Sequence, residues 1–127
     1  MPLARISLRK GKPAAYRKAI ADNVYEALRE TFTVPENDRF ITISEFDADN
    51  FVYSPDYLGI PRSDDLVIME ITVSNTRSAE QKQTLYRRIV ERLAEQPGLR
   101  PEDALIILVE VLPENWSFGR GVASYIK

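Results

Sequence analysis

The chain has 127 residues, 44% of them hydrophobic and 28% charged, with a formal net charge of −2 at pH 7; this fits one globular domain and excludes a disordered chain. The chain contains no cysteine, which excludes disulfides and thiolate chemistry, and no histidine, which excludes a Ser-His-Asp triad. Any proton transfer must therefore use carboxylates, tyrosines, lysines or the terminal amine. The chain has no run of basic residues, so we expect no nucleic-acid partner. No apolar stretch approaches the ~20 residues of a membrane span, so we expect no membrane partner and a cytoplasmic location.

The first part of the chain predicts a strand, a helix and a second strand. LARISL (3–8) alternates along its length, with apolar residues on one face. Pro13 suits the first turn of a helix, and apolar residues then recur at helical spacing to about residue 32. VPEND (34–38) has the composition of a turn, and FITISEF (40–46) is rich in β-branched and aromatic residues, which favours a strand.

Residues 47–65 form the longest predicted loop, since they contain Pro, Gly and Ser together with five Asp. A short hairpin around FVY (51–53) is the one regular element expected there. The DADN start of the loop (47–50) resembles a calcium loop but lacks its glycine and its twelfth-position glutamate, which favours solvated acids. A loop of this length inside a compact domain is often functional.

The same order of elements then begins again. LVIMEITV (66–73) predicts a strong strand, and Ser78 followed by Gln81 is the signature of a capping box at the start of a helix. The apolar stripe of that helix ends before Pro97, and PEDALIILVEVL (101–112) predicts a turn and a last strand.

The fold class expected is α/β, with two consecutive βαβ units in one domain, 1–127: about 2–46 and 66–112, followed by a tail at 113–127. VPEND-RFITISEF parallels RPED-ALIILVEV, which indicates a duplicated unit. Each unit should pair its strands in parallel through a right-handed helical crossover. Two helices cover only one face of a four-stranded sheet, yet the strands of the second unit are apolar on both faces. We therefore expect the other face to be buried in a homo-oligomer.

Pro2 and Asp38 are the first two candidates for a functional site. Removal of Met1 would leave Pro2 as the amino terminus, a secondary amine that takes up and releases protons. Otherwise Pro2 is simply the second residue of an edge strand. Asp38 is either a turn acid or a positioned base.

Two further stretches contain candidate binding residues. Arg77 lies in NTRS (75–78), between a strand and a helix, where small anions bind, and its planar guanidinium matches a carboxylate. A surface arginine is the alternative. In ENWSFGRG (114–121), Trp116 and Phe118 either line a pocket or plug an edge of the core.

Together these stretches resemble the tautomerase superfamily, specifically the branch around malonate semialdehyde decarboxylase. The resemblance covers nearly the whole chain and is carried by Pro2 after Met1, VPENDRF, YLGI–RSDDLVI, the S-x-x-RS-x-EQK pattern at 74–82, and ENWSFGRG. It implies the fold of 4-oxalocrotonate tautomerase and macrophage migration inhibitory factor, with the two helices on one face of the sheet. It also implies a homotrimer and cofactor-free catalysis by the amino-terminal proline.

The resemblance assigns roles to single residues. It implies that Pro2 is the catalytic amine after Met1 is removed, and that Asp38 is the acid that orients or activates water. Arg77 matches the second of two arginines that bind the substrate carboxylate, and the first falls on Asn75, which is neutral.

The same resemblance matches Trp116 and Phe118 to an aromatic pocket wall, so substrate binding is expected to involve both of them and Asn75. The function expected is a tautomerase that moves a proton on a small 2-oxo or enol carboxylic acid. In it Pro2 is the general base or acid, and Arg77 binds carboxylate or enolate charge. Two alternatives stay open: a decarboxylase or hydratase of 3-oxo acids such as malonate semialdehyde, and a non-catalytic small-molecule-binding or assembly domain.

Overall fold

The computed structural model describes residues 2–126, so the predicted removal of Met1 concerns a residue outside the described range. The main elements, in chain order, are β1 (Leu3–Arg9), α1 (Ala14–Phe32), β2 (Phe40–Phe46), β3 (Val67–Ser74), α2 (Ala79–Glu95) and β4 (Ala104–Val111). They follow the predicted order closely, and the two βαβ units are confirmed.

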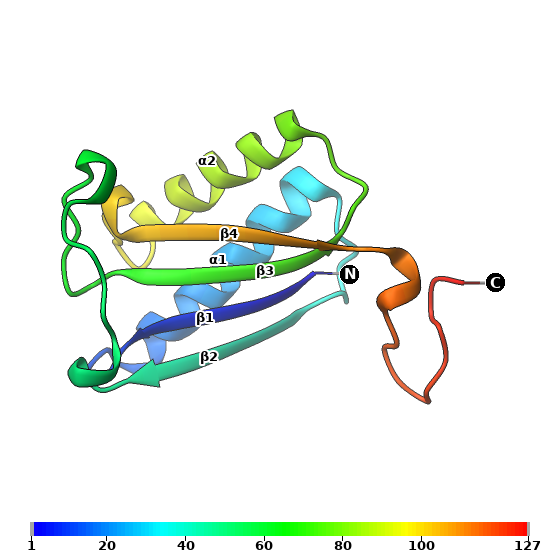
Figure 1. Cartoon of the computed structure of the whole chain (residues 1–127), viewed down its shortest axis with the longest axis horizontal. Coiled ribbons are helices and arrows are strands. Elements are labelled where there is room, and N and C mark those ends of the chain that lie inside the picture. Colours follow the sequence, from blue (N-terminus) through cyan, green and yellow to red (C-terminus); the bar gives the residue numbers. More distant parts are fainter. Residues whose placement is uncertain (1, 127) are drawn as a thin grey trace.

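The four strands form one mixed sheet in the order β2-β1-β3-β4 (Figure 1). Within each unit the strands are parallel, as predicted: β1 with β2, and β3 with β4. The two units meet through β1 and β3, which are antiparallel, with Leu3 opposite Thr72. The start of β1 therefore lies beside the end of β3, at the same end of the sheet as the end of β4. This join brings residues from both units to the same end of the sheet.

Both helices cover one face of the sheet, and the core lies between helices and sheet (Figure 1). The largest fully buried side chains are Phe32, Ile6, Ile20, Leu28, Leu66, Met69, Ile71, Leu85, Ile89 and Leu93. The predicted capping box is present at α2, where the Ser78 hydroxyl accepts from the Gln81 N–H at 3.2 Å and the Gln81 side chain accepts from the Ser78 N–H at 3.0 Å. Within residues 2–126, neither helix is long and apolar enough to cross a bilayer.

The opposite face of the sheet keeps apolar side chains at the surface. On β4, Leu105, Ile107 and Val109 retain 38%, 49% and 38% of their exposure, whereas their neighbours Ile106 and Leu108 pack against the core. This alternation follows from the period of two along a strand. It confirms that the helices cover only one of the two apolar faces.

The loop 47–65 is present as predicted, but the short hairpin around FVY (51–53) is wrong. The loop contains two single turns of 3₁₀ helix, Ala48–Asn50 and Tyr57–Gly59, and no strand. The Arg62 side chain donates to three carbonyls of this loop at 3.1 to 3.3 Å. Those carbonyls are thus satisfied by a side chain rather than by a paired strand. The loop lies at the end of the sheet away from the N-terminus (Figure 1).

Candidate active site

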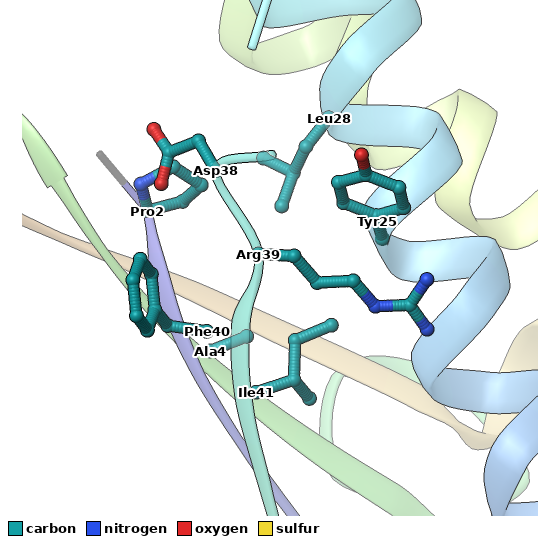
Figure 2. Close-up of a pocket in the computed structure, with 8 residues that line it drawn as sticks. All are labelled: Pro2, Ala4, Tyr25, Leu28, Asp38, Arg39, Phe40 and Ile41. Atoms are coloured by element: carbon teal, nitrogen blue, oxygen red, sulfur yellow. The ribbon is translucent and has the colours of Figure 1, made fainter. Parts of the chain in front are cut away.

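Pro2 and Asp38 meet where β1 and β2 begin side by side. Leu3 pairs with Phe40 in the parallel ladder, so the residues just before the two strands are neighbours. Pro2 is buried, and Asp38 is half-buried with its Oδ1 atom shielded from solvent. Figure 2 shows the Asp38 carboxylate beside the Pro2 ring, above a narrow pocket closed by Tyr25 and other side chains. The parallel pairing of the first unit is what brings the two predicted residues together.

The turn that carries Asp38 is held in place by α1. The Asp38 N–H donates to the Pro35 carbonyl at 3.1 Å, which closes the turn. The hydroxyl of Tyr25, a buried residue of α1, donates to the Glu36 carbonyl. The Arg39 guanidinium lies 4.6 Å from the Tyr25 ring in a cation–π contact. These contacts fix the position of the Asp38 carboxylate. The hydrogen bond from Tyr25 to the turn could not be predicted from the sequence.

An aromatic wall stands on the other side of Pro2. The Trp116 and Phe118 rings are stacked, with centroids 5.1 Å apart and planes at 9°, and Phe40 lies 5.7 Å from Phe118. A cavity of about 260 Å³ lies between Pro2 and this wall. The Trp116 Nε1–H donates to the hydroxyl of Ser74 at 3.0 Å. Ser74 is buried at the end of β3, so the antiparallel join of the units places the indole beside Pro2.

A second cavity, of about 380 Å³, opens on the side of Asp38. Phe40 and Phe118 line it together with the VPEND turn and Tyr125, a residue that the sequence analysis missed. Tyr125 meets Phe118 edge-on, with centroids 5.3 Å apart and planes at 77°. The tail has no periodic pattern. The only feature of the sequence that could have indicated a role for Tyr125 is its position a few residues after the two glycines of GRG (119–121).

Arg77 occupies the predicted junction between β3 and α2. Its Nη2 donates to the carbonyl of Phe32, the last residue of α1, at 2.6 Å, and its Nη1 donates to the Thr76 hydroxyl at 3.0 Å. Its guanidinium carbon lies 5.0 Å from the Phe32 ring. Burial lowers the pKa of Arg77 from its ordinary value, and the electrostatic influence of Tyr125 acts in the opposite direction. A guanidinium stays charged at neutral pH, so these contacts anchor a cation near the tail.

Asn75 is exposed, and its backbone N–H donates to the Val111 carbonyl at 2.9 Å, where β3 and β4 end. Among the described residues, neither Asn75 nor Arg77 lines the two cavities at Pro2 or the cavity on the side of Asp38. The predicted site residues that line these cavities are Pro2, Asp38, Trp116 and Phe118.

Comparison with known families gives two matches to this chain. One family model, described as tautomerase enzyme, matches residues 38–119, and a second with the same description matches residues 2–61. Among curated proteins, the chain is 35% identical to the probable tautomerase YusQ of Bacillus subtilis over 127 residues, which covers 100% of both chains.

Two solved structures are similar over nearly the full length. A structure set of malonate semialdehyde decarboxylase, which includes a proline-to-alanine mutant and an inactivated form, superimposes with a TM-score of 0.91 at 34% identity, covering 97% of this chain and 95% of that one. FG41 malonate semialdehyde decarboxylase inhibited by 3-bromopropiolate also gives a TM-score of 0.91, at 36% identity, with 97% of this chain and 93% of that one covered.

Proposed function

Because the chain belongs to the tautomerase family, we propose that it is a cofactor-independent enzyme that moves a proton on a small 2-oxo or enol carboxylic acid. The family and the similarity to malonate semialdehyde decarboxylases support a tautomerase-type enzyme. The finer proposal, that the amine of Pro2 is the acid or base, rests on one observation. Pro2 lies between the Asp38 carboxylate and the Trp116–Phe118 wall, at the edge of two cavities.

Proton transfer at Pro2 follows from the chemistry of a terminal secondary amine. Such an amine has a pKa of about 8 when unperturbed; apolar surroundings lower this pKa, and a neighbouring carboxylate raises it. When neutral, Pro2 removes the proton from the carbon next to a carbonyl and returns it to the neighbouring carbon or oxygen, so the substrate is isomerised without gain or loss of atoms. Asp38 orients the amine and the substrate during these two steps.

Arg77 is proposed to bind the negative charge of the substrate. Its contacts with the Phe32 carbonyl and the Thr76 hydroxyl fix the plane of the guanidinium, and a planar guanidinium matches the shape and charge of a carboxylate. A cation held in this way stabilises the charge that develops on an enolate. A substrate that contacts both Pro2 and Arg77 must extend beyond the cavities at Pro2, because Arg77 does not line them.

A decarboxylase or hydratase of 3-oxo acids is the second candidate, because two relatives at 34% and 36% identity are malonate semialdehyde decarboxylases. In that reaction a protonated Pro2 polarises the carbonyl, the bond to the carboxylate breaks, carbon dioxide leaves, and the resulting enolate takes up a proton. For hydration, Asp38 would position the water, which suits its place beside Pro2.

Comparing wild type with Pro2→Ala on phenylenolpyruvate and on malonate semialdehyde tests the proposal. We expect the variant to lose about 10²-fold or more in kcat/KM on the true substrate class, the usual scale for a general acid or base. Turnover of the enol alone favours the tautomerase, and carbon dioxide release from the semialdehyde favours the decarboxylase. Equal rates for the two proteins on both compounds would end the catalytic role of Pro2.

A homotrimer completes the proposal. The outer face of β4 exposes Leu105, Ile107 and Val109, and a row of apolar side chains of this kind is suited to association. We expect this face to be buried between copies of the chain. Light scattering should give three times the mass of one chain, and a monomer at micromolar concentration would contradict the proposal.

A further inference from the structure

The residues on both sides of Asp38 are held by the first helix. Before it, the carbonyl of Glu36 accepts a hydrogen bond from the Tyr25 hydroxyl. After it, the Arg39 guanidinium lies over the Tyr25 ring at 4.6 Å and forms an ion pair with Asp22. Tyr25 and Asp22 both belong to α1, so one element sets the position of the segment that carries the acid.

The side chains of Asp38 and Arg39 point in opposite directions. Figure 2 shows Arg39 directed toward α1 and Asp38 directed toward the Pro2 ring. Successive side chains alternate where the chain becomes extended, as it does at the start of β2. Contacts that keep Arg39 on the helix side therefore also keep the Asp38 carboxylate on the side of Pro2.

Tyr25 joins these contacts to the core of the domain. It is buried, whereas Glu36 and Arg39 are exposed. Its ring lines the narrow pocket at Pro2 and Asp38, and its hydroxyl reaches the turn. A side chain that is itself locked by packing holds its hydrogen-bond partner more firmly than a surface side chain does. Tyr25 is thus the rigid support of an otherwise exposed turn.

We propose that Tyr25 is a positioning residue for the reaction: its hydroxyl holds the VPEND turn so that the Asp38 carboxylate stays beside the Pro2 amine. The inference rests on the proposed function for the role of Asp38. Because the Tyr25 hydroxyl donates to the Glu36 carbonyl, it acts through the turn rather than on the substrate. A displacement of about 1 Å at a reacting group costs about 10²-fold in rate. Loss of this hydroxyl should therefore slow the chemical step more than it weakens substrate binding.

Tyr25→Phe isolates the hydroxyl, because it keeps the aromatic ring beneath Arg39 and in the pocket. The variant should fold, since Glu36 is exposed and water can replace the donor that its carbonyl loses. Tyr16→Phe is the matched control. Tyr16 lies on the same helix, and its ring also contacts a cation, Lys12 at 5.0 Å, but at the opposite end of the sheet.

Hydrogen exchange followed by NMR tests the hold on the turn without any substrate. The amide of Asp38, which donates within the turn, is the reporter, and the amide of Gln81, which donates to Ser78 at the start of α2, is the internal reference. We expect Tyr25→Phe to speed exchange at Asp38 about fivefold to tenfold, the equivalent of one hydrogen bond, and to leave Gln81 unchanged. Tyr16→Phe should change neither rate. An unchanged rate at Asp38 in Tyr25→Phe would overturn the inference.

Steady-state kinetics test whether the position of Asp38 matters for the reaction. On phenylenolpyruvate or malonate semialdehyde, whichever wild type turns over faster, we expect Tyr25→Phe to lower kcat about tenfold and to change KM by less than about twofold. In an Asp38→Asn background, the same change should lower kcat by less than about twofold, because the group that it positions is already lost. Tyr16→Phe should match wild type. An unchanged kcat, or equal losses in the two backgrounds, would overturn the inference.

Failure of this inference can be told apart from failure of the proposed function. A loss of activity in Pro2→Ala together with wild-type kcat in Tyr25→Phe would end the role of Tyr25 alone. Full activity in Pro2→Ala would end the proposed role of Pro2. The exchange rate at Asp38 is read without turnover, so it still decides in that case whether Tyr25 holds the turn.

Discussion

The two βαβ units carry an acid at the same place and use it differently. Asp38 precedes β2 in VPENDRF, and Asp103 precedes β4 in RPEDAL. Asp38 is half-buried and borders two cavities. Asp103 is 0% exposed, and its two oxygens accept from the Ser63 N–H at 2.7 Å and from the Ser63 hydroxyl at 2.6 Å. One acid borders open space, whereas the other holds the 47–65 loop against the domain.

The residue beside each acid explains the difference. Matching the parallel strand pairs of the two units places Val67 where Pro2 lies in the first unit. Val67 is 0% exposed, and its nitrogen belongs to a backbone amide, which is not basic enough to take up a proton near neutral pH. In the second unit the arriving loop brings Ser63 to the acid instead. In the proposed function only Asp38 takes part in proton transfer, because only the acid of the first unit lies beside Pro2.

Asp38→Asn should cause the largest loss of kcat/KM among these variants. It tests whether Asp38, the acid of the first unit, acts in catalysis. The change keeps the size of the side chain but removes its charge and basicity, so we expect kcat/KM to fall by about 10²–10⁴-fold, the range of general acid–base groups. The melting temperature should change much less than the activity, because Asp38 is half-buried at the border of two cavities and outside the packed core. Steady-state kinetics measure the first effect, and full activity in this variant would make Asp38 a mere turn acid.

Arg77→Ala should have the next largest effect, a loss of about 2–4 kcal/mol of transition-state stabilisation, as for one charge-stabilising donor. Lys12 provides the control, because it is a cation that follows β1 in the first unit as Arg77 follows β3 in the second. It is ion-paired with Asp65 at 2.8 Å at the opposite end of the sheet. Lys12→Ala should leave kcat/KM unchanged. If Arg77→Ala also leaves kcat/KM unchanged, Arg77 serves only to anchor the end of α1.

Asp103→Asn should have the smallest effect on activity and tests the structural half of the comparison. Replacing a buried acceptor that binds Ser63 twice should lower the free energy of unfolding by about 1–3 kcal/mol. Urea denaturation measures this loss, and kcat/KM of the folded protein should stay near wild type. A variant with native stability but reduced activity would contradict a purely structural role for Asp103.

Much of this molecule could be predicted from the sequence because its determinants are local. Periodicity located the strands and helices, and Ser78 with Gln81 marked the start of α2. Parallel pairing within a unit was also predictable, and this pairing places Pro2 and Asp38 close together. By contrast, the bond from Arg77 to the Phe32 carbonyl joins residues of different units, so no local pattern could reveal it.

The tail and the long loop were harder to predict for the same reason. Tyr125 reaches the site because residues 119–121 reverse the chain and Ser124 bonds back to Trp116, contacts that leave no periodic trace. The prediction of a hairpin around FVY (51–53) was wrong. Carbonyls of this loop accept hydrogen bonds from the Arg62 side chain instead of from a second strand.

The central claim, that the chain becomes an enzyme through the free amine of Pro2, is tested most directly by mass spectrometry of the N-terminal peptide. The protein is incubated with 3-bromopropiolate, the electrophilic acid that inhibits one of its relatives. We expect Met1 to be absent and the adduct to be on Pro2, and we expect Pro2→Ala to be labelled far more slowly. A retained Met1, or an adduct elsewhere with the Pro2 amine unmodified, would contradict it.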